Sequence, residues 1–566
     1  MGDTGYDAVV VGAGAGGAAA AWRMTQRGWR VLLLDAGPWF DPDADYGLDR
    51  PDWEREGFRH KPGSLGETRF AALQELDPAL ADLRSWSLGQ GPTNRESRRA
   101  VSGPGYHHVR GIGGTTLHFV GESHRMNPAS MAMRSRFGVA ADWPVTYAEL
   151  EPWYLEVERL LGVAGPAEVR DRWRSAPYPL PAHPLSRASR RLARGAAALG
   201  FAWDANPRCA LSQPYDGRPS CNYCGGCTHG CPRRDKGSAD VSFVAKAKAS
   251  GRCDIRANTT LLRIVQGGGA DGNRGERGSD AGATTAGSRN RRIAAIEISE
   301  GGRRQRLPVR RLVLACGAIE TPRMLLLAPG LANASGQVGR NLLESVAWTS
   351  IGRVDEPLLS FGGLPADAIT WHHNRPDSIP GVIGGFRLSA AIHESEMIGA
   401  IAHAQRAVPG FGREHKREMR RVVGSTVAVG AVGESLPHPR SKVDLDPVGR
   451  DRFGRPFARI HSYVDSMTVQ RLRAMAGAAR ALLRASEVTT LVEEYGTYDH
   501  FSSAHVFGTC RMGKDPRHSV VDANLRVHGF DNFHICDASV FPSSGGGEAP
   551  SLTIQALALR AVDRMV

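Results

Sequence analysis

The first 35 residues alternate between short apolar runs and glycine-rich turns. Val9–Val11 and Val31–Leu34 are runs of aliphatic residues with no polar alternation, which predicts two strands buried on both faces. The alanine-rich stretch Ala18–Arg27 lies between them and predicts a helix. A strand, a helix and a second strand in this order indicate an α/β unit with a parallel sheet.

Apolar residues at helical spacing recur in two later segments. Residues 143–163 predict a helix in which Thr146 is the N-cap, because Glu149 follows three residues later as in a capping box. Residues 466–485 predict a second, longer helix. Between these segments, residues 311–326 read as a strand, a glycine turn and the start of a helix.

One stretch has almost no apolar side chains. Residues 266–292 consist mainly of Gly, Ala, Ser, Asp, Asn and Arg, a composition that cannot bury a core. Strand-like runs at Leu261–Val265 and Ile293–Ile298 flank it. We therefore expect a flexible surface insertion at the tip of a long hairpin.

The size and composition are those of an ordinary globular protein. A chain of 566 residues, 41% hydrophobic and 23% charged, is too long for one simple core and predicts two domains, which can be interleaved. No run of 18 apolar residues is present, so we expect no membrane-spanning helix. The N-terminus lacks the order of a secretory signal, which predicts a cytoplasmic protein.

The formal net charge of +13 raises the question of nucleic-acid binding. The chain has no recognition helix, zinc finger or aromatic-stacking motif, so we expect no nucleic-acid partner. Part of the excess is local, since five arginines lie in or beside residues 266–292. A solvated basic face explains the charge, and such a face also suits docking of an acidic electron-transfer partner.

The glycine-rich turn after the first strand has dinucleotide-binding spacing. Gly12, Gly14 and Gly17 fit G-x-G-x-x-G, in which the glycines allow a tight turn, close approach of a pyrophosphate and packing of the helix on the strand. Asp35 ends the second strand, 23 residues after Gly12, where an acid accepts hydrogen bonds from a ribose diol. These residues predict a bound adenine dinucleotide.

Four cysteines form a compact run with the spacing C-x2-C-x2-C-x3-C-P, which is typical of a bacterial iron–sulfur loop. The predicted ligands are Cys221, Cys224, Cys227 and Cys231. At least three would hold a 3Fe-4S or 4Fe-4S cluster; zinc and plain structural thiols are the alternatives. The other five cysteines are scattered, which does not resemble a secreted disulfide scaffold.

Six further motifs follow the dinucleotide turn. They lie at residues 110–118, 311–326, 338–342, 505–513, 521–542 and 550–560. In this order they resemble the glucose–methanol–choline (GMC) family of flavoprotein oxidoreductases, from residue 7 to residue 563. The resemblance implies a Rossmann-like FAD-binding domain built from separated segments, 1–349 and 496–566. It also implies an inserted α+β substrate domain with an antiparallel sheet, 350–495.

The resemblance assigns the FAD contacts residue by residue. Gly12, Gly14, Gly17 and Asp35 would hold the ADP part, with the strand around Leu261 beside the adenine. The remaining contacts would come from Gly113, Gly114 and Thr115 along the pyrophosphate and the isoalloxazine edge, and from Asp537 and Ser539 near the ribityl chain. His118 stands where some family members attach FAD covalently and others keep a non-bonded histidine.

The catalytic positions follow from the same resemblance. His505 occupies the position of the family's catalytic histidine, and a histidine suits a general base because its pKa lies near neutral pH. At the second position the family has Asn or His, whereas alignment on Pro550 places Ala549 there. The adjacent Glu548 is an alternative base or hydrogen-bond acceptor.

Taken together, these residues predict an FAD-dependent dehydrogenase that oxidises a CH–OH group of a sugar, polyol or glycoside-like alcohol. Sugar dehydrogenases of the family that have cytochrome partners carry a similar cysteine-rich loop, which suggests electron transfer through a cluster to an acceptor protein or small subunit. An oxidase that produces hydrogen peroxide is the first alternative. A non-catalytic flavin or iron–sulfur protein, suggested by Ala549, is the second.

Overall fold

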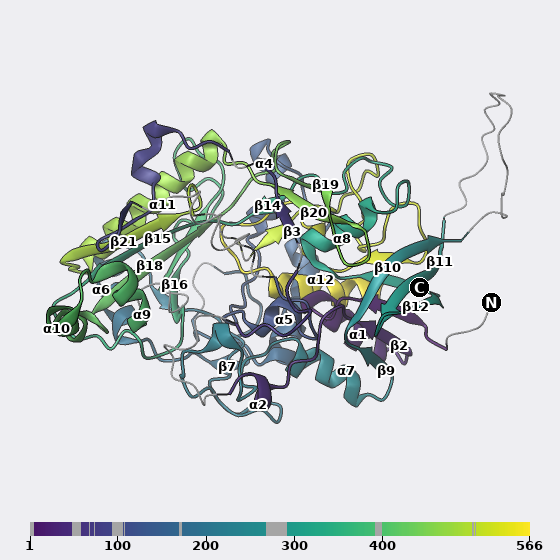
Figure 1. Ribbon diagram of the computed structural model, residues 1–566, viewed down its shortest axis with the longest axis horizontal. Coiled ribbons are helices and arrows are strands. Elements are labelled where there is room, and N and C mark those ends of the chain that lie inside the picture. The colour runs from purple at the N-terminus through teal and green to yellow at the C-terminus, as the bar shows by residue number, and fades with distance from the viewer. Residues whose placement is uncertain are drawn as a thin grey trace.

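The computed structural model describes residues 5–47, 58–66, 68–72, 74–92, 106, 108–168, 172–267, 291–390, 399–500, 503 and 505–566. Two large sheets lie toward opposite ends of the molecule (Figure 1). One is near both chain termini and contains the first strands of the chain. The other lies beside the long helix α11 (Ser466–Ala485).

The first sheet is parallel throughout, with the strand order β23-β13-β1-β2-β9. Its strands are β1 (Ala8–Val11), β2 (Val31–Leu34), β9 (Cys253–Arg256), β13 (Leu312–Leu314) and β23 (Phe533–Ile535). Four of the five strands come from widely separated parts of the chain. The predicted α/β class and the two predicted N-terminal strands are confirmed.

Helices cover this sheet with their apolar side chains. Helix α1 (Ala15–Gln26) packs against α12 (Ser551–Asp563), and α12 packs in turn against α5 (Tyr147–Leu161). Helix α1 begins three residues before the predicted start, because Gly14 is its N-cap. The capping box predicted for Thr146 and Glu149 is present at the start of α5.

The second sheet has eight strands in the order β5-β4-β21-β15-β18-β17-β16-β8, and every pair in it is antiparallel. Its central strands are β21 (Thr490–Gly496), β15 (Val346–Arg353), β18 (Thr426–Gly433), β17 (Phe386–Ala390) and β16 (Ala368–Thr370). Its edges are β4 (Trp86–Ser87), β5 (Gly91–Pro92) and β8 (Asp204–Ala205). The antiparallel sheet predicted for residues 350–495 is thus completed by strands from outside that range.

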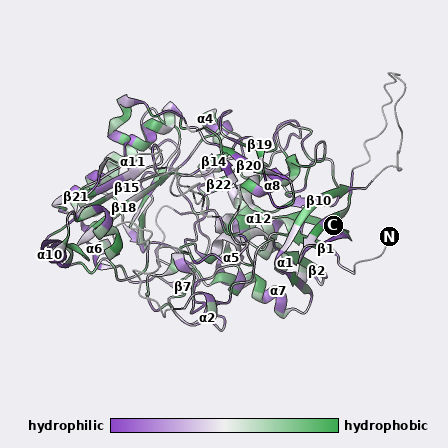
Figure 2. Cartoon of the chain, viewed as in Figure 1, coloured by the Kyte–Doolittle hydropathy of each residue, from purple (hydrophilic) through white to green (hydrophobic). Residues whose placement is uncertain are grey.

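One face of this sheet is covered by α11, which begins and ends at the predicted residues. Helix α6 (Arg187–Ala198) packs against α11, and their apolar side chains form a second hydrophobic core with Trp348 and Leu388. Figure 2 shows the contrast between α10 (Gly412–Val422), which is strongly hydrophilic, and the hydrophobic segments in the interior.

The predicted hairpin is present where the structure describes it. Strands β10 (Thr259–Gln266) and β11 (Ile293–Glu300) pair antiparallel, and Gln266 stands opposite Ile293. Residues 268–290 of the predicted flexible insertion lie outside the described residues. Strand β12 (Arg303–Pro308) completes a three-stranded sheet with this hairpin.

The remaining α-helices and strands belong to neither of the two large sheets. They are α2 (Pro42–Asp45), α4 (Met133–Phe137), α7 (Ala245–Ala249), α8 (Gly317–Leu326), α9 (Ala400–Ala402), β3 (Thr68–Phe70), β6 (Ala164–Gly165), β7 (Leu180–Pro181), β14 (Leu343–Glu344), β19 (Lys442–Arg450), β20 (Pro456–His461) and β22 (Val506–Phe507). Among the described helices, none combines the length and the apolar character needed to cross a bilayer.

Candidate active site

A cavity of about 1840 Å³ joins the two large sheets. At one end it is lined by Gly12, Gly14 and Asp35, which follow the first strands of the parallel sheet. At the other end it is lined by residues of the antiparallel sheet, among them Thr349 and Tyr495. A site of this extent has room for a dinucleotide together with a small substrate.

The dinucleotide end is shaped by close contacts that only glycine permits. Gly12 has a φ of +100°, and a Cβ on it would lie 2.3 Å from the carbonyl oxygen of Ala315. A Cβ on Gly17 would lie 1.9 Å from the carbonyl oxygen of Gly12, so α1 can pack on its strand only with glycine there. Both glycines therefore have the roles predicted from the motif: a tight turn and close helix packing.

A second glycine-rich loop packs directly against the first at the cavity wall. A Cβ on Gly114 would lie 2.8 Å from the Cα of Gly14, and both residues line the cavity. Gly14 is also the N-cap of α1, whose free backbone N–H groups attract a negatively charged ligand. Because neither glycine carries a side chain, the backbone at this contact is open to a diphosphate in the cavity.

The Asp35 carboxylate holds these loops in place. Its Oδ2 accepts a hydrogen bond from the backbone N–H of Ala13 at 2.8 Å, and its Oδ1 accepts one from Gly37 at 2.9 Å. Burial raises the pKa of Asp35, while the backbone donors act in the opposite direction. Asp35 also lines the cavity, and its carboxylate can accept one further hydrogen bond from a ribose hydroxyl.

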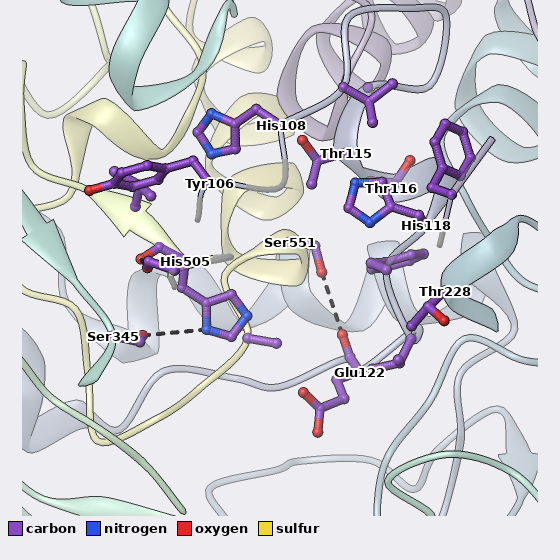
Figure 3. A pocket seen from close by; sticks show the side chains of 18 of the residues that line it. Tyr106, His108, Thr115, Thr116, His118, Glu122, Thr228, Ser345, His505 and Ser551 are labelled. Carbon is purple, nitrogen blue, oxygen red and sulfur yellow. Dashed lines mark hydrogen bonds between the residues drawn. The ribbon is translucent and has the colours of Figure 1, made fainter. Parts of the chain in front are cut away.

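Most of the other predicted cofactor contacts reach the same cavity. Thr115, His118, Leu261 and Asp537 line it, and Figure 3 shows Thr115 and His118 on its wall. Asp537 is fixed by the backbone N–H of Gly317 at 3.0 Å and by a neighbouring threonine hydroxyl. Burial raises the pKa of the Asp537 carboxyl.

Three predicted contacts do not line the cavity. Gly17 lies behind the wall, where it packs α1 on its strand. Gly113 lies behind the wall, with its N–H bonded to the carbonyl oxygen of Ala13 at 3.0 Å. Ser539 is fully buried, and within the described residues its hydroxyl has no hydrogen-bond partner. Their direct contact with a cofactor stays a prediction.

His505 lies just before β22, which pairs with β14 and so holds the histidine beside the cavity. Its Nδ1 lies 3.3 Å from the hydroxyl oxygen of Ser345, whose backbone N–H donates to the His505 carbonyl at 3.1 Å. Figure 3 shows this contact, with Nε2 on the ring edge that faces away from Ser345. Burial lowers the pKa of His505 to about 4, so the ring is neutral at pH 7.

The two candidates for the second catalytic position point in different directions. Ala549 lines the cavity, and its backbone N–H donates to Nδ1 of His124 at 3.0 Å. Glu548 does not line the cavity, because its carboxylate is turned toward Asn374 and Arg172, at 2.9 Å and 3.4 Å. The structure thus brings Ala549 to the cavity with His505 and leaves Glu548 outside it.

Reasoning from sequence missed an ion pair in the cavity wall. Glu122 Oε2 accepts a hydrogen bond from Nη2 of Arg387 at 2.7 Å, and both side chains line the cavity. Asn206 donates to the other carboxylate oxygen at 2.7 Å. Glu122 lies four residues after His118, close to a motif identified from the sequence. Its partners Asn206 and Arg387 lie 84 and 265 residues away, so no local sequence pattern indicates the ion pair.

The cysteine-rich loop is not arranged as a metal site. All four cysteines of the motif lie in the described part of the chain, where no three metal-ligating side chains gather in a group that could hold a metal ion. Cys224 is exposed while Cys227 is buried, and burial raises the pKa of Cys221 to about 12. The predicted iron–sulfur or zinc centre at Cys221, Cys224, Cys227 and Cys231 therefore finds no support in this conformation.

Instead, the loop forms part of the cavity wall. Cys224, Thr228 and His229 line the cavity. The ammonium group of Lys236, which is only 1% exposed, donates to the carbonyl oxygens of Leu117, Phe119 and Cys227 at 2.9, 2.8 and 2.7 Å. This buried cation joins the cysteine-rich loop to the loop that carries His118.

Comparison with known proteins agrees with this geometry. Residues 110–347 and 437–558 match two family models that are both described as GMC oxidoreductase. Residues 10–63 match a model described as an NAD(P)-binding Rossmann-like domain.

Several characterised proteins are similar over nearly their whole length. The fructose dehydrogenase large subunit of Gluconobacter japonicus is 28% identical over 99% of this chain and 97% of its own. The 2-methyl-1,2-propanediol dehydrogenase of Mycolicibacterium austroafricanum is 26% identical, with coverage of 98% and 94%. The 6'''-hydroxyparomomycin C oxidase of Streptomyces lividus is 29% identical, with coverage of 98% and 90%.

The fold is also found among solved structures. Pyridoxine 4-oxidase from Mesorbium loti aligns over 99% of both chains with a TM-score of 0.60 and 18% sequence identity. At this identity the likeness concerns the fold.

Proposed function

Because this chain belongs to the GMC oxidoreductase family, we propose that it oxidises a CH–OH group of a sugar, polyol or glycoside-like alcohol to a carbonyl, with FAD as its cofactor. The observation that supports this most strongly is the single cavity that joins the dinucleotide-binding glycines to His505. Similar proteins are named for fructose, 2-methyl-1,2-propanediol and 6'''-hydroxyparomomycin C, which supports the choice of substrate class.

The residues present fit FAD. Because Gly14 and Gly114 carry no side chains, the backbone at the N-terminus of α1 is accessible to its diphosphate, and Asp35 lines the same end of the cavity. We assign the adenine to the vicinity of Leu261 and the flavin to the stretch between His118 and His505. When bound there, FAD supplies the acceptor for the hydride of the alcohol carbon.

In this proposal His505 takes the proton of the substrate hydroxyl. Its ring is neutral at pH 7, so one nitrogen carries a free lone pair. If Nδ1–H donates to the Ser345 hydroxyl, the lone pair is on Nε2, on the ring edge opposite Ser345. Ser345 would thus select the tautomer that acts as a base.

The experiment that tests this function is anaerobic mixing with a panel of sugars, polyols and simple alcohols, while flavin absorbance is followed. Bleaching by members of the panel supports the proposal; no bleaching by any of them favours a non-catalytic flavoprotein. Both dehydrogenases and oxidases occur among the similar proteins. Hydrogen peroxide released during aerobic turnover identifies an oxidase, and its absence a dehydrogenase.

Transfer of electrons through an iron–sulfur cluster is not part of the proposed mechanism, because the described cysteine-rich loop does not form a ligand set. Iron and sulfide analysis of anaerobically prepared protein tests the prediction from cysteine spacing. Iron and sulfide together would mean that the loop rearranges around a cluster. One similar protein is named as a large subunit, so we also propose a partner subunit that accepts electrons.

The domain division inferred from the sequence belongs to the same proposal. Residues 1–349 and 496–566 would form the FAD-binding domain, and residues 350–495 the substrate domain. The antiparallel sheet supports the assignment of the central range, since its five central strands lie between residues 346 and 496.

Replacement of Ala549 by asparagine is expected to accelerate flavin reduction by about tenfold. An amide at this cavity position can hydrogen-bond the substrate oxygen, and tenfold corresponds to about 1.4 kcal/mol of barrier. Stopped-flow reduction under anaerobic conditions measures the effect. Glu548→Gln is the matched control, because Glu548 lies outside the cavity and its neutralisation should leave the reduction rate within a few-fold.

If instead Glu548→Gln slows reduction strongly and Ala549→Asn changes nothing, the carboxylate takes part in the reaction. That result would contradict the orientation described above.

A further inference from the structure

Glu122, whose carboxylate is ionised, lines the same cavity as His505. Glu122 is 4% exposed, and burial alone would raise its pKa. The guanidinium of Arg387 and further positive or donating neighbours outweigh burial and lower the pKa of Glu122 to about 2. Glu122 therefore carries a full negative charge at every pH at which the enzyme is expected to work.

This charge is tied to the segment that contains Ala549. The Ser551 hydroxyl donates to the Glu122 carbonyl oxygen at 3.4 Å, as Figure 3 shows. Arg387, the ion-pair partner of Glu122, donates through Nε to the Gly547 carbonyl oxygen at 2.7 Å. His124, two residues after Glu122, accepts from the Ala549 N–H. Three contacts thus fix Glu122 and its neighbours to residues 547–551.

A buried ion pair is costly to form, and apolar residues of similar size are often at least as stabilising. Its position in the cavity wall beside the proposed base therefore suggests a role in the reaction. Ala549 provides no polar group at the second catalytic position. The negative charge that acts on His505 from the cavity wall is that of Glu122.

We propose that Glu122 is a positioning residue that acts through His505, by stabilising the imidazolium that forms when the substrate O–H bond breaks and an N–H bond forms at Nε2. The inference rests on the proposed function, in which His505 is the base. A fixed negative charge inside a protein stabilises a new positive charge more strongly than it would in water.

The groups that act on His505 agree with this role. Burial lowers the pKa of His505, Glu122 raises it, and Arg387 lowers it by less than Glu122 raises it. The groups that face Glu122 itself are Arg387, His124 and Arg208. Arg208 is held by the carbonyl oxygens of Pro365 and Val120. Removal of the Glu122 charge would therefore leave His505 under the influence of burial and of Arg387 alone.

The experiment compares Glu122→Gln with the wild-type holoenzyme in anaerobic flavin reduction by an alcohol from the panel that bleaches it. We expect the limiting rate to fall by about 10- to 100-fold, with FAD content unchanged. Its solvent isotope effect should increase because proton transfer becomes more limiting. The Glu122→Asp variant keeps the negative charge, so its limiting rate should lie between those of the wild type and Glu122→Gln. An unchanged limiting rate and isotope effect in Glu122→Gln would overturn the inference.

Loss of Glu122 also leaves Arg387 without its partner, and a double variant separates that effect. In Glu122→Gln/Arg387→Gln both charges are gone, and glutamine can still donate toward Gly547. If the rate recovers to that of the wild type, the slow step came only from an unpaired arginine and the inference fails. If the rate stays low, the carboxylate itself is required.

His505→Ala in the same assay distinguishes the inference from the function on which it rests. If His505→Ala reduces its flavin as fast as the wild type, the proposed base is wrong. If His505→Ala is slow while Glu122→Gln is unaffected, only the role of Glu122 is rejected.

Discussion

Replacement of His505 by alanine is expected to slow flavin reduction by substrate by about 10²–10⁴-fold, the usual cost of losing a positioned general base. The flavin should stay bound with its spectrum intact, because the residues assigned to the ADP part of FAD (Gly12, Gly14 and Asp35) lie at the opposite end of the cavity. His518→Ala is a matched control, since His518 is exposed and does not line the cavity. A His505→Ala enzyme with the wild-type rate would show that another group takes the proton.

The pH dependence provides an independent check. Because the pKa of His505 is about 4, the base is fully available at neutral pH and is lost as the pH falls through about 4. The wild-type rate should therefore fall on the acid side near pH 4, and His505→Ala should lack this fall. The lowered pKa of His505 also affects the stability of the fold. At a pH between about 4 and the ordinary pKa of histidine, His505 is protonated in the unfolded chain but neutral in the folded protein. The free energy of unfolding should therefore decrease as the pH falls through this range.

Replacement of Gly14 by phenylalanine is expected to yield protein with almost no bound FAD. A Cβ alone would fit, because the nearest atom is the Cα of Gly114 at 3.9 Å, but a phenyl ring would occupy the cavity space beside the N-terminus of α1. FAD released by denaturation and measured against protein concentration gives the result. Full FAD occupancy in this variant would place the diphosphate elsewhere.

Gly477→Ala serves as its control. Gly477 lies in α11 with no atom within 4 Å of a built Cβ, so this variant should keep its FAD. Alanine in a helix interior stabilises by about 0.5–1 kcal/mol relative to glycine, so the control should melt no lower than the wild type.

The parts of the structure that sequence predicts well are those with a local cause. The β1–α1–β2 unit, the cap at Thr146 and the bounds of α11 depend on residues within a few positions of each other. His505 and the glycine contacts were found through ordered motifs. The structure explains why Gly12 and Gly17 must be glycine: any side chain at either position would clash with a backbone carbonyl oxygen.

The parts that sequence misses depend on residues far apart. Strand β4 pairs with β21 through Ser87 and Glu493, and β8 pairs with β16 through Ala205 and Ala368, so both partners lie far along the chain. Strands of two residues also leave no periodic pattern. The Glu122–Arg387 pair spans 265 residues. For Glu548 and Ala549, the sequence could not show which of two adjacent side chains faces the cavity. The cysteine spacing predicts a ligand set that this loop conformation does not form.

The order of strands in the parallel sheet has a consequence for how the protein is made. Strand β23 pairs with β13, and α12 packs on α1, so residues 533–563 complete the domain that residues 8–34 begin. Synthesis of 566 residues takes roughly half a minute to two minutes at about 5–20 residues per second. During that time the N-terminal glycine loop has no finished sheet beside it. The FAD-binding end of the cavity is therefore complete only after residues 533–563 have been synthesised, and a nascent chain that stalls before β23 leaves an apolar strand edge open to aggregation.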